Sequence, residues 1–517
     1  MAPFQWLKEA ITPLLQTNLP SSFLAIVFLI LLLVLNYLLK QKNPKKQSYN
    51  LPPSPPKLPI IGNLHQLGNL PHLSLRRLSD KFGPIIHLQL GEIPTVVVSS
   101  ARLAKEVLKT HDLAISSRPR IYGAKYLFYN CTDIAFSPYG AYWRHIRKIC
   151  ILELLSAKRV QSYSYVREEE VERLIRRIAD QSYKKNNVDL SKMLGLYAND
   201  VVCRSSFGRD FSEGGEYDKH GFQKMLEEYQ ALLGGFSLGD YFPSMEWIHS
   251  ITGIKSRLVN TTGRFDRFFD EIIEEHRNSK KAGKGDHKDI VDVLLNIKKD
   301  DENLTMDNIK AVILDMFAGG TDTTFATLDW GMTELVTNPR VMEKAQNEIR
   351  TIVGDRKTVL ESDLPQMHYL KAVIKETFRM HPPATVLMPR ESMEDITIDG
   401  YNIPAKTRFT VNAWAIGRDP ECWENPNVFE PERFMSSTLD YKGLDFEFIP
   451  FGSGRRMCPA LTFGVAGIEL SIAQLLHSFD WELPHSIRAE DLDMTEVFGI
   501  TMHRISHLIL IAKPRFH

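Results

Sequence analysis

The chain has 517 residues, and its 63 lysine and arginine residues balance 63 aspartate and glutamate residues. Zero net charge gives no global basic field, so we expect no nucleic-acid partner. Five scattered cysteines without a CxxC pair exclude a disulfide framework and a zinc knuckle, and they fit a reducing compartment. No glycine- or serine-rich linker and no repeat divides the chain after residue 60, so we expect one large domain.

The N-terminal segment indicates a membrane anchor. Residues 19–39 are almost wholly apolar, and a helix of that length spans about 30 Å, the thickness of the bilayer hydrocarbon. A cleaved signal peptide is the alternative, but the basic residues follow the apolar run instead of preceding it. Lysines after the run place the following domain in the cytosol. We therefore expect residues 1–18 in the lumen, one membrane pass over 19–39, and a main domain over 61–517.

Residues 40–60 are predicted to be a basic and proline-rich hinge. The prolines between 51 and 59 each fix their own φ and push the preceding residue toward extended geometry, which predicts a semi-rigid spacer. After the hinge, two strands are expected at 85–90 and 95–99, joined by a turn over 91–94. The remainder is mainly helical by apolar period, with a charged surface loop near 278–288 and short strands near 396–403, 409–412 and 505–512.

Two helical stretches contain polar residues in a suggestive arrangement. Trp143 and Arg147 are four residues apart and share one helix face, which can turn inward, while Arg144 and Lys148 share another face about 100° away. A long helix over about 306–336 contains two successive glycines, which cost roughly 1 kcal/mol each relative to alanine. A packing or functional reason for these glycines is therefore expected.

The segment 450–460 holds Cys458 among glycines and arginines, directly before an apolar run that predicts a helix over 461–470. Glycines let the backbone lie close to a flat ligand, and a helix N-terminus favours a thiolate, so the segment suits an iron ligand. The residues alone equally allow a buried structural cysteine or a phosphate-binding nest. The chain has no GxGxxG behind a strand and no GxSxG elbow, and His503 and His507 lack a metal-site context.

Phe451-x-x-Gly454-x-Arg456-x-Cys458 resembles the haem-thiolate loop of the cytochrome P450 family. The resemblance runs from about Leu51 to the C-terminus. The sequences of its motifs are similar to those of the plant microsomal, A-type branch. Ala460 departs from the family, which usually has glycine there. Four further family motifs precede the loop in the expected order: Trp143-x-x-x-Arg147, Ala318–Thr324, Glu376-x-x-Arg379 and Pro431–Phe434.

The resemblance implies a mainly α fold with small β-sheets, behind a single N-terminal transmembrane helix. It implies haem b as cofactor, with Cys458 as the axial ligand of its iron. Asp322 and Thr323 would relay protons in a locally distorted helix, and Glu376, Arg379 and Arg433 would lock the scaffold. The cofactor-binding residues that it implies are Trp143, Arg147, Arg390, Phe451, Arg456 and Cys458.

The expected function is a monooxygenase in the endoplasmic reticulum membrane, with a cytosolic catalytic domain that contacts membrane lipid. It would oxidise a small lipophilic plant specialised metabolite, with a terpenoid favoured over an alkaloid, using electrons from NADPH through NADPH-cytochrome P450 reductase. A reductase-independent isomerase or dehydratase and a non-enzymatic membrane scaffold are the alternatives, which the Asp322-Thr323 pair and the intact Cys458 disfavour. By resemblance, the substrate pocket is bounded by residues 121–136, 222–236, 315–323, 384–388 and 498–501.

Overall fold

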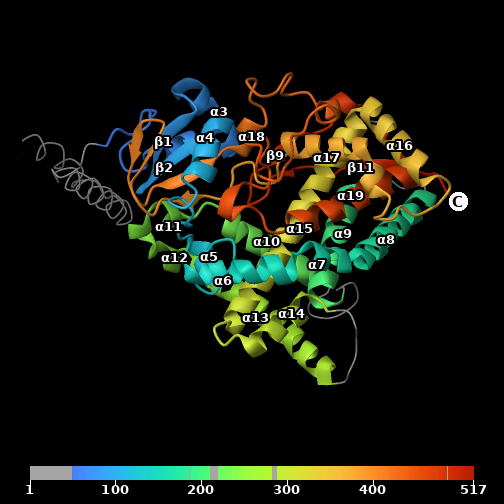
Figure 1. Cartoon of the computed structure of the whole chain (residues 1–517), viewed down its shortest axis with the longest axis horizontal. Coiled ribbons are helices and arrows are strands. Elements are labelled where there is room, and N and C mark those ends of the chain that lie inside the picture. Colours follow the sequence, from blue (N-terminus) through green and yellow to red (C-terminus); the bar gives the residue numbers. More distant parts are fainter. Residues whose placement is uncertain (1–48, 185–186, 210–218, 282–287, 486, 517) are drawn as a thin grey trace, which may run out of the picture.

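The structure is a computed structural model that describes residues 49–184, 187–209, 219–281, 288–485 and 487–516 (Figure 1). The predicted luminal segment 1–18, the predicted anchor 19–39 and residues 40–48 of the predicted hinge 40–60 lie outside these residues. In the described ranges, no helix is both long enough and apolar enough to cross a membrane.

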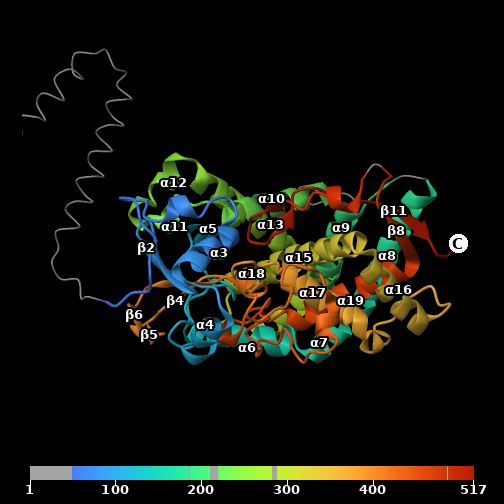
Figure 2. The same cartoon turned by 90° about the horizontal axis from the view of Figure 1, so that it is seen from above.

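The described chain is mainly helical, as predicted, with its largest sheet at one end and helices making up most of the rest (Figures 1 and 2). Short 3-10 or π turns occur between several elements. The helices are α3 (Pro71–Phe82), α4 (Ala101–Lys105), α5 (Tyr122–Leu127), α6 (Ala141–Ile149), α7 (Ala157–Ser162), α8 (Ser164–Tyr183), α9 (Leu190–Phe207), α10 (Lys219–Gly234), α11 (Leu238–Tyr241), α12 (Ile248–Ile251), α13 (Ile254–Lys281), α14 (Ile290–Asp300), α15 (Met306–Thr337), α16 (Pro339–Val353), α17 (His368–Met380), α18 (Ala413–Ile416) and α19 (Leu461–Ser478).

The strands form one four-stranded sheet, in the order β1-β2-β7-β4, and three smaller sheets. In the larger sheet β1 and β2 are antiparallel, β2 and β7 are parallel, and β4 and β7 are antiparallel. The strands are β1 (Ile85–Leu90), β2 (Ile93–Val98), β3 (Val188–Asp189), β4 (Arg390–Glu391), β5 (Ile396–Ile398), β6 (Tyr401–Ile403), β7 (Arg408–Val411), β8 (Phe479–Glu482), β9 (Glu496–Val497), β10 (His503–Arg504) and β11 (Ile509–Pro514).

Three strand predictions need correction at their edges. The turn between β1 and β2 is shorter than predicted, because Pro94 already pairs with Gln89. The single strand expected over 396–403 is a hairpin, since Asp399 and Gly400 both have positive φ and reverse the chain. The strand expected from 505 begins at Ile509 as β11.

Two predicted loops also differ. The charged stretch near 278–288 begins as helix, because α13 continues to Lys281, and residues 282–287 lie outside the described ranges. The proline-rich segment is non-helical, as predicted, but it packs on the domain: the Pro53 carbonyl accepts a hydrogen bond from the His87 N–H of β1 at 2.8 Å.

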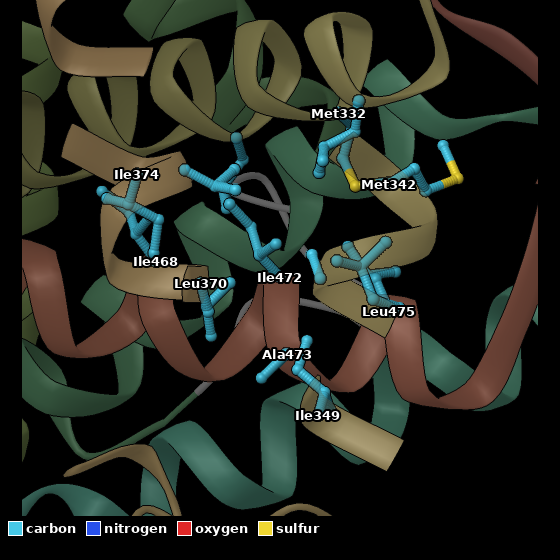
Figure 3. Close-up of a cluster of buried hydrophobic side chains, with 14 of the residues drawn as sticks. Met332, Met342, Ile349, Leu370, Ile374, Ile468, Ile472, Ala473 and Leu475 are labelled. Carbon is cyan, nitrogen blue, oxygen red and sulfur yellow. The ribbon is translucent and has the colours of Figure 1, made fainter. Parts of the chain in front are cut away.

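The largest core cluster joins helices that are far apart in sequence. Figure 3 shows side chains of α15, α16, α17 and α19 meeting in one apolar layer, among them Met332, Met342, Leu370 and Ile472. Burial of this kind contributes roughly 1.5–3 kcal/mol for each large apolar side chain. The layer therefore holds α15 and α19 firmly, and both of these helices border the site described next.

Helix α15 begins at a capping box, in which the Thr305 hydroxyl accepts from the Asn308 N–H while the Asn308 side chain accepts from the Thr305 N–H. The helix then runs for 32 residues, which matches the predicted range of about 306–336. Figure 2 shows it passing through the middle of the molecule.

Candidate active site

A cavity of about 330 Å³ lies between α15, the loop before α19 and the four-stranded sheet. All five segments predicted as pocket walls contribute to it. Its lining includes Ile134, Ala135, Phe136, Tyr229, Leu233, Asp315, Met316, Gly319, Gly320, Thr323, Ala384, Leu387, Met388, Ile500 and Thr501 from those walls, and Arg118, Arg147, Arg390, Phe451, Arg456 and Cys458 from elsewhere.

The loop that carries Cys458 is closed by its own backbone. The Cys458 N–H donates to the Phe451 carbonyl at 3.0 Å, and α19 begins three residues later, at Leu461. Gly454 has a φ of +71°, and a Cβ built there would lie 2.3 Å from the Leu108 carbonyl oxygen, so only glycine fits this close approach. The predicted helix after the loop extends beyond 470, to Ser478.

The thiol of Cys458 borders the cavity at the start of α19. Burial raises its pKa, while the backbone N–H of Ala460 and the charge of Arg147 act in the opposite direction. Ala460 has a φ of −94°, which suits alanine as well as glycine. Alanine at this position, where the family usually has glycine, therefore causes no backbone strain. The other four cysteines are free of disulfides, as predicted.

Four arginine side chains converge on the same cavity: Arg118, Arg147, Arg390 and Arg456. Their guanidinium groups donate mainly to backbone carbonyls, such as Arg456 to Ser137 at 2.6 Å. Burial, together with the charges of Arg390 and Arg147, lowers the pKa of Arg456 to about 9. Because a guanidinium keeps its proton in proteins, a cluster of this kind is stabilised by an anion placed against it.

Trp143 lies behind this cluster, outside the cavity lining. Its indole N–H donates to the Ile134 carbonyl at 3.0 Å, and the Arg456 guanidinium stacks over its ring at 4.0 Å. The helix faces follow the prediction, because Trp143 is buried and Arg147 reaches the cavity while Arg144 and Lys148 are exposed.

Sequence reasoning did not find Arg118. This residue is buried and donates to the Ala135 carbonyl at 2.9 Å and the Met388 carbonyl at 2.7 Å. It lies in an irregular segment directly before Pro119, where no helical or strand period shows which way a side chain points. The only feature of the sequence that could have pointed to Arg118 as a site residue is that it is an arginine between apolar segments.

The residues present fit a haem. Iron of haem accepts a cysteine thiolate, and the two haem propionates are natural partners of guanidinium groups. Here one thiol and four guanidiniums border one apolar cavity, and the acids near the arginines, Asp112 and Asp133, leave positive charge in excess. The donor set therefore matches both ends of that cofactor.

The two glycines of α15 have different reasons to be there. A Cβ on Gly320 would lie 3.0 Å from Val202 of α9, so this glycine allows the two helices to pack closely. A Cβ on Gly319 would meet nothing within 4 Å, so this glycine leaves room in the cavity. The predicted local distortion is not seen, because α15 is continuous; the Thr323 hydroxyl donates to the Gly319 carbonyl at 2.7 Å instead.

The structure separates the two residues predicted to relay protons. Thr323 lines the cavity, but Asp322 points elsewhere and pairs with His503 of β10, with 2.9 Å between Oδ1 and Nε2. The His503 ring also stacks on Phe325 at 5.5 Å. His503, which the sequence suggested was a surface residue, is therefore partly buried against α15.

The predicted scaffold network is present. Glu376 and Arg379 are fully buried and form two hydrogen bonds of 2.7 Å, and Arg433 joins them at 3.1 Å. Arg379 also donates to the carbonyls of Gly417 and Pro426, so it ties α17 to the irregular segment that precedes the Cys458 loop.

Comparison with known proteins identifies relatives along the whole described chain. The "Cytochrome P450 71AP13" of Prunus mume is 71% identical over 95% of this chain and 95% of its own length. "Strychnine-11-hydroxylase" of Strychnos nux-vomica is 47% identical over 95% and 96%. "Premnaspirodiene oxygenase" of Hyoscyamus muticus is 45% identical over 96% and 98%. All three are plant proteins, and the names of the last two indicate oxygenation of different metabolites.

The fold has a counterpart among solved structures. A zebrafish cytochrome P450 with abiraterone aligns over 87% of this chain and 100% of its own, with a TM-score of 0.72 and 26% sequence identity. The family model described as "Cytochrome P450" matches residues 52–510. The chain therefore belongs to the cytochrome P450 family, in its plant A-type branch, and is a monooxygenase that uses haem-thiolate iron and electrons supplied from NADPH by a reductase.

Proposed function

We propose that this cytochrome P450 inserts one oxygen atom of O₂ into a small lipophilic plant specialised metabolite, with a terpenoid favoured and an alkaloid next. The observation that carries the proposal is the cavity wall: around Thr323 it is built mainly from apolar side chains, such as Ile134, Leu233 and Met388. A wall of this kind binds a ligand through apolar contact and orients it with a few polar groups. The relatives' names indicate more than one substrate, so they do not choose between a terpenoid and an alkaloid. The choice of a terpenoid rests on the apolar wall.

The site residues then divide the work. Haem bound at Cys458 supplies the activation of O₂. Arg147, Arg390 and Arg456, joined by Arg118, would hold its propionates, and Trp143 supports the Arg456 guanidinium from behind. Phe451 closes the Cys458 loop through its carbonyl and packs its ring on Phe378 at 5.0 Å.

Proton movement is assigned to α15. Thr323 presents its hydroxyl at the cavity, and Asp322 lies one residue earlier, in contact with His503. We propose that Asp322 takes up protons at its contact with His503 and that water passes them on to the Thr323 hydroxyl at the cavity. Positioned acid–base groups of this kind typically contribute factors of about 10²–10⁴ to a rate.

The electron donor is a separate reductase, and a basic surface is available for it. Arg144, Lys148 and Lys158 are exposed on or just after α6, the helix whose inner face carries Arg147. Exposed apolar side chains, Ile151 and Leu152, lie between them in sequence. An acidic flavoprotein would be steered to this patch by complementary charge.

Attachment to the endoplasmic reticulum membrane, through residues 19–39 and a lipid-facing surface, is part of the proposal. Large apolar side chains are exposed along the segment from α10 to α12, with Phe236 68% exposed, Trp247 58% and Ile251 75%. Exposed apolar residues that gather in one segment typically mark a contact surface, and a bilayer suits the position of α11 and α12 at the same end of the molecule as the start of the described chain (Figures 1 and 2).

Microsomes that contain the full chain and a reductase should be supplied with NADPH, labelled O₂ and a library of plant terpenoids and alkaloids. The proposal expects products carrying one labelled oxygen atom, with terpenoids as the better substrates. Products that form without NADPH, or that carry no labelled oxygen, would overturn it. A library in which only alkaloids react would reject the favoured class.

A further inference from the structure

Two carboxyl groups meet at the edge of the cavity. Asp133 is fully buried in the loop between α5 and α6, and Asp315 reaches the cavity from α15. The two side chains lie close enough for the charge of Asp133 to act on Asp315. They hold the same short stretch of loop, because Asp315 Oδ2 accepts from the Ile134 N–H at 2.7 Å while Asp133 Oδ2 accepts from the Phe136 N–H at 2.7 Å.

One oxygen of this pair lacks a donor. Asp133 Oδ1 is buried and receives no hydrogen bond from an N–H or hydroxyl group of the described residues. Two ionised carboxylates side by side repel each other, and a proton between them removes the repulsion and satisfies the bare oxygen at once. The geometry thus calls for one proton on the pair.

The surroundings decide which carboxyl group carries the proton. Burial raises the pKa of Asp133 to about 6, while the backbone N–H groups that it accepts from and the charge of Arg456 act in the opposite direction and favour its ionised form. Enclosure and the neighbouring charge of Asp133 raise the pKa of Asp315 well above its usual value, with only backbone N–H groups acting in the opposite direction. The proton therefore belongs on Asp315, donated toward Asp133.

The other titratable groups that face the pair do not compete for this proton. Tyr142 of α6, Tyr229 of α10 and Cys150 after α6 each have a pKa raised above its ordinary value, chiefly by burial. All three are therefore neutral and add no charge near Asp315. The charge of Asp322 also reaches Tyr229.

We infer that Asp133 and Asp315 share one proton, so that Asp315 presents an uncharged carboxylic acid to the cavity and the site takes uncharged lipophilic substrates in preference to protonated amines. Both oxygens of Asp315 are then used, one by the Ile134 N–H and one toward Asp133, and neither offers an anionic partner to a ligand. The inference rests on the proposed function and narrows its substrate class.

Infrared difference spectroscopy tests the protonation directly. The holoprotein at neutral pH should be compared with Asp315→Asn, which keeps the size and the acceptor oxygen for Ile134. We expect the wild type to show the carbonyl band of a protonated carboxylic acid, sensitive to D₂O, and the variant to lack it. If Asp315→Asn instead removes the band of an ionised carboxylate and no acid band, the inference is overturned.

The second variant, Asp133→Asn, shows which of the two carboxyl groups carries the proton. If Asp315 carries it, the acid band remains in this variant, because enclosure alone keeps Asp315 neutral. Disappearance of the band would place the proton on Asp133 and contradict the inference. This variant also serves if Asp315→Asn fails to fold.

Ligand binding tests the consequence for substrates. The probes are an adamantane carrying a trimethylammonium group and its uncharged isostere carrying a tert-butyl group. Binding of each probe is measured from the shift that it causes in the haem absorption spectrum, without reductase. Because the cation loses its hydration without gaining a charged partner, we expect it to bind at least about tenfold more weakly, and Asp315→Asn to change that ratio less than about threefold.

Equal or tighter binding of the cation, abolished in Asp315→Asn, would show that Asp315 is an ionised amine-binding group. The haem-thiolate spectrum would be intact in that case, so failure of this inference is distinguishable from failure of the proposed function.

Discussion

Consecutive residues of α15 lie in different surroundings, because each step along the helix turns the side chain by about 100°. Thr323 faces the cavity, Asp322 contacts His503, and Gly320 packs on Val202. The sequence predicted the helix and its special residues, but Asp322 and Thr323 were expected to relay protons together in a locally distorted helix. The partner of Asp322 could not be read from the sequence, since His503 lies about 180 residues away in a short hairpin.

Replacing Thr323 with alanine should uncouple electron use from product formation. The variant keeps haem and substrate binding, but the hydroxyl that passes protons into the cavity is gone. We expect product per NADPH to fall by a factor on the order of ten, with the missing electrons recovered as hydrogen peroxide. Asp322→Asn should show the same direction of change, measured in the same assay.

Thr323→Ser is the matched control, because serine keeps the hydroxyl and loses only a methyl group. Coupling close to that of the wild type is expected. If Thr323→Ala and Asp322→Asn also retain full coupling, neither residue belongs to the proton path.

The protonated Asp315 predicts how stability depends on pH. Its pKa is raised in the folded protein above the unfolded value of about 3.8, so the contribution is fully present below that value and declines as pH rises toward the folded pKa. The free energy of unfolding should therefore fall by about 1.4 kcal/mol per pH unit more steeply in the wild type than in Asp315→Asn. Denaturant unfolding of the two proteins between mildly acidic and neutral pH gives this difference; parallel profiles would mean that Asp315 is ionised in the native state.

Among the elements, long periodic helices were the easiest to predict and short strands the hardest. The apolar period predicted α15 to within about one residue at each end. The β5–β6 hairpin was taken as one strand, although Asp399-Gly400 is the dipeptide that type I′ turns prefer. Arg118 and Asp133 stayed unnoticed because both lie in irregular segments, whose side-chain directions depend on tertiary contacts.

The two glycines of α15 provide a matched pair of alanine substitutions. Gly320→Ala places a methyl group against Val202 and should destabilise the fold by about 1–3 kcal/mol through overpacking between α15 and α9. Gly319→Ala meets no such neighbour and should stabilise the helix by up to about 1 kcal/mol, while its methyl group takes up cavity space and weakens substrate binding.

Thermal unfolding measures the change in stability that each substitution causes. Ligand titration followed by the haem spectrum measures the weaker substrate binding expected for Gly319→Ala. Equal effects of the two substitutions on stability would contradict the separate roles assigned to the glycines.

At the scale of the whole molecule, a chain of zero net charge still carries a local basic patch at Arg144, Lys148 and Lys158. Replacing all three with glutamate should slow reductase-supported turnover by about tenfold and weaken its salt dependence, because charge steers the encounter. Turnover supported by peroxide and substrate affinity should not change. Equal loss in both assays would indicate a damaged fold.

A control for charge is available elsewhere on the surface. Lys81, Lys255 and Arg267 are exposed on α3 and α13, away from α6 in Figure 2, and their reversal changes the net charge by the same amount. Reductase-supported turnover should stay near the wild-type rate in this variant. If both variants slow it equally, the effect comes from net charge and the patch at α6 has no specific role.

The central claim, a haem held by Cys458, is tested most directly by the carbon monoxide difference spectrum of the reduced protein. The wild type and variants that replace Cys150 or Cys203 with alanine should show the band of a thiolate-ligated haem, because these buried cysteines lie outside the cavity lining. Cys458→Ala should lose that band. Absence of the band in the wild type, or its persistence in Cys458→Ala, would contradict the account.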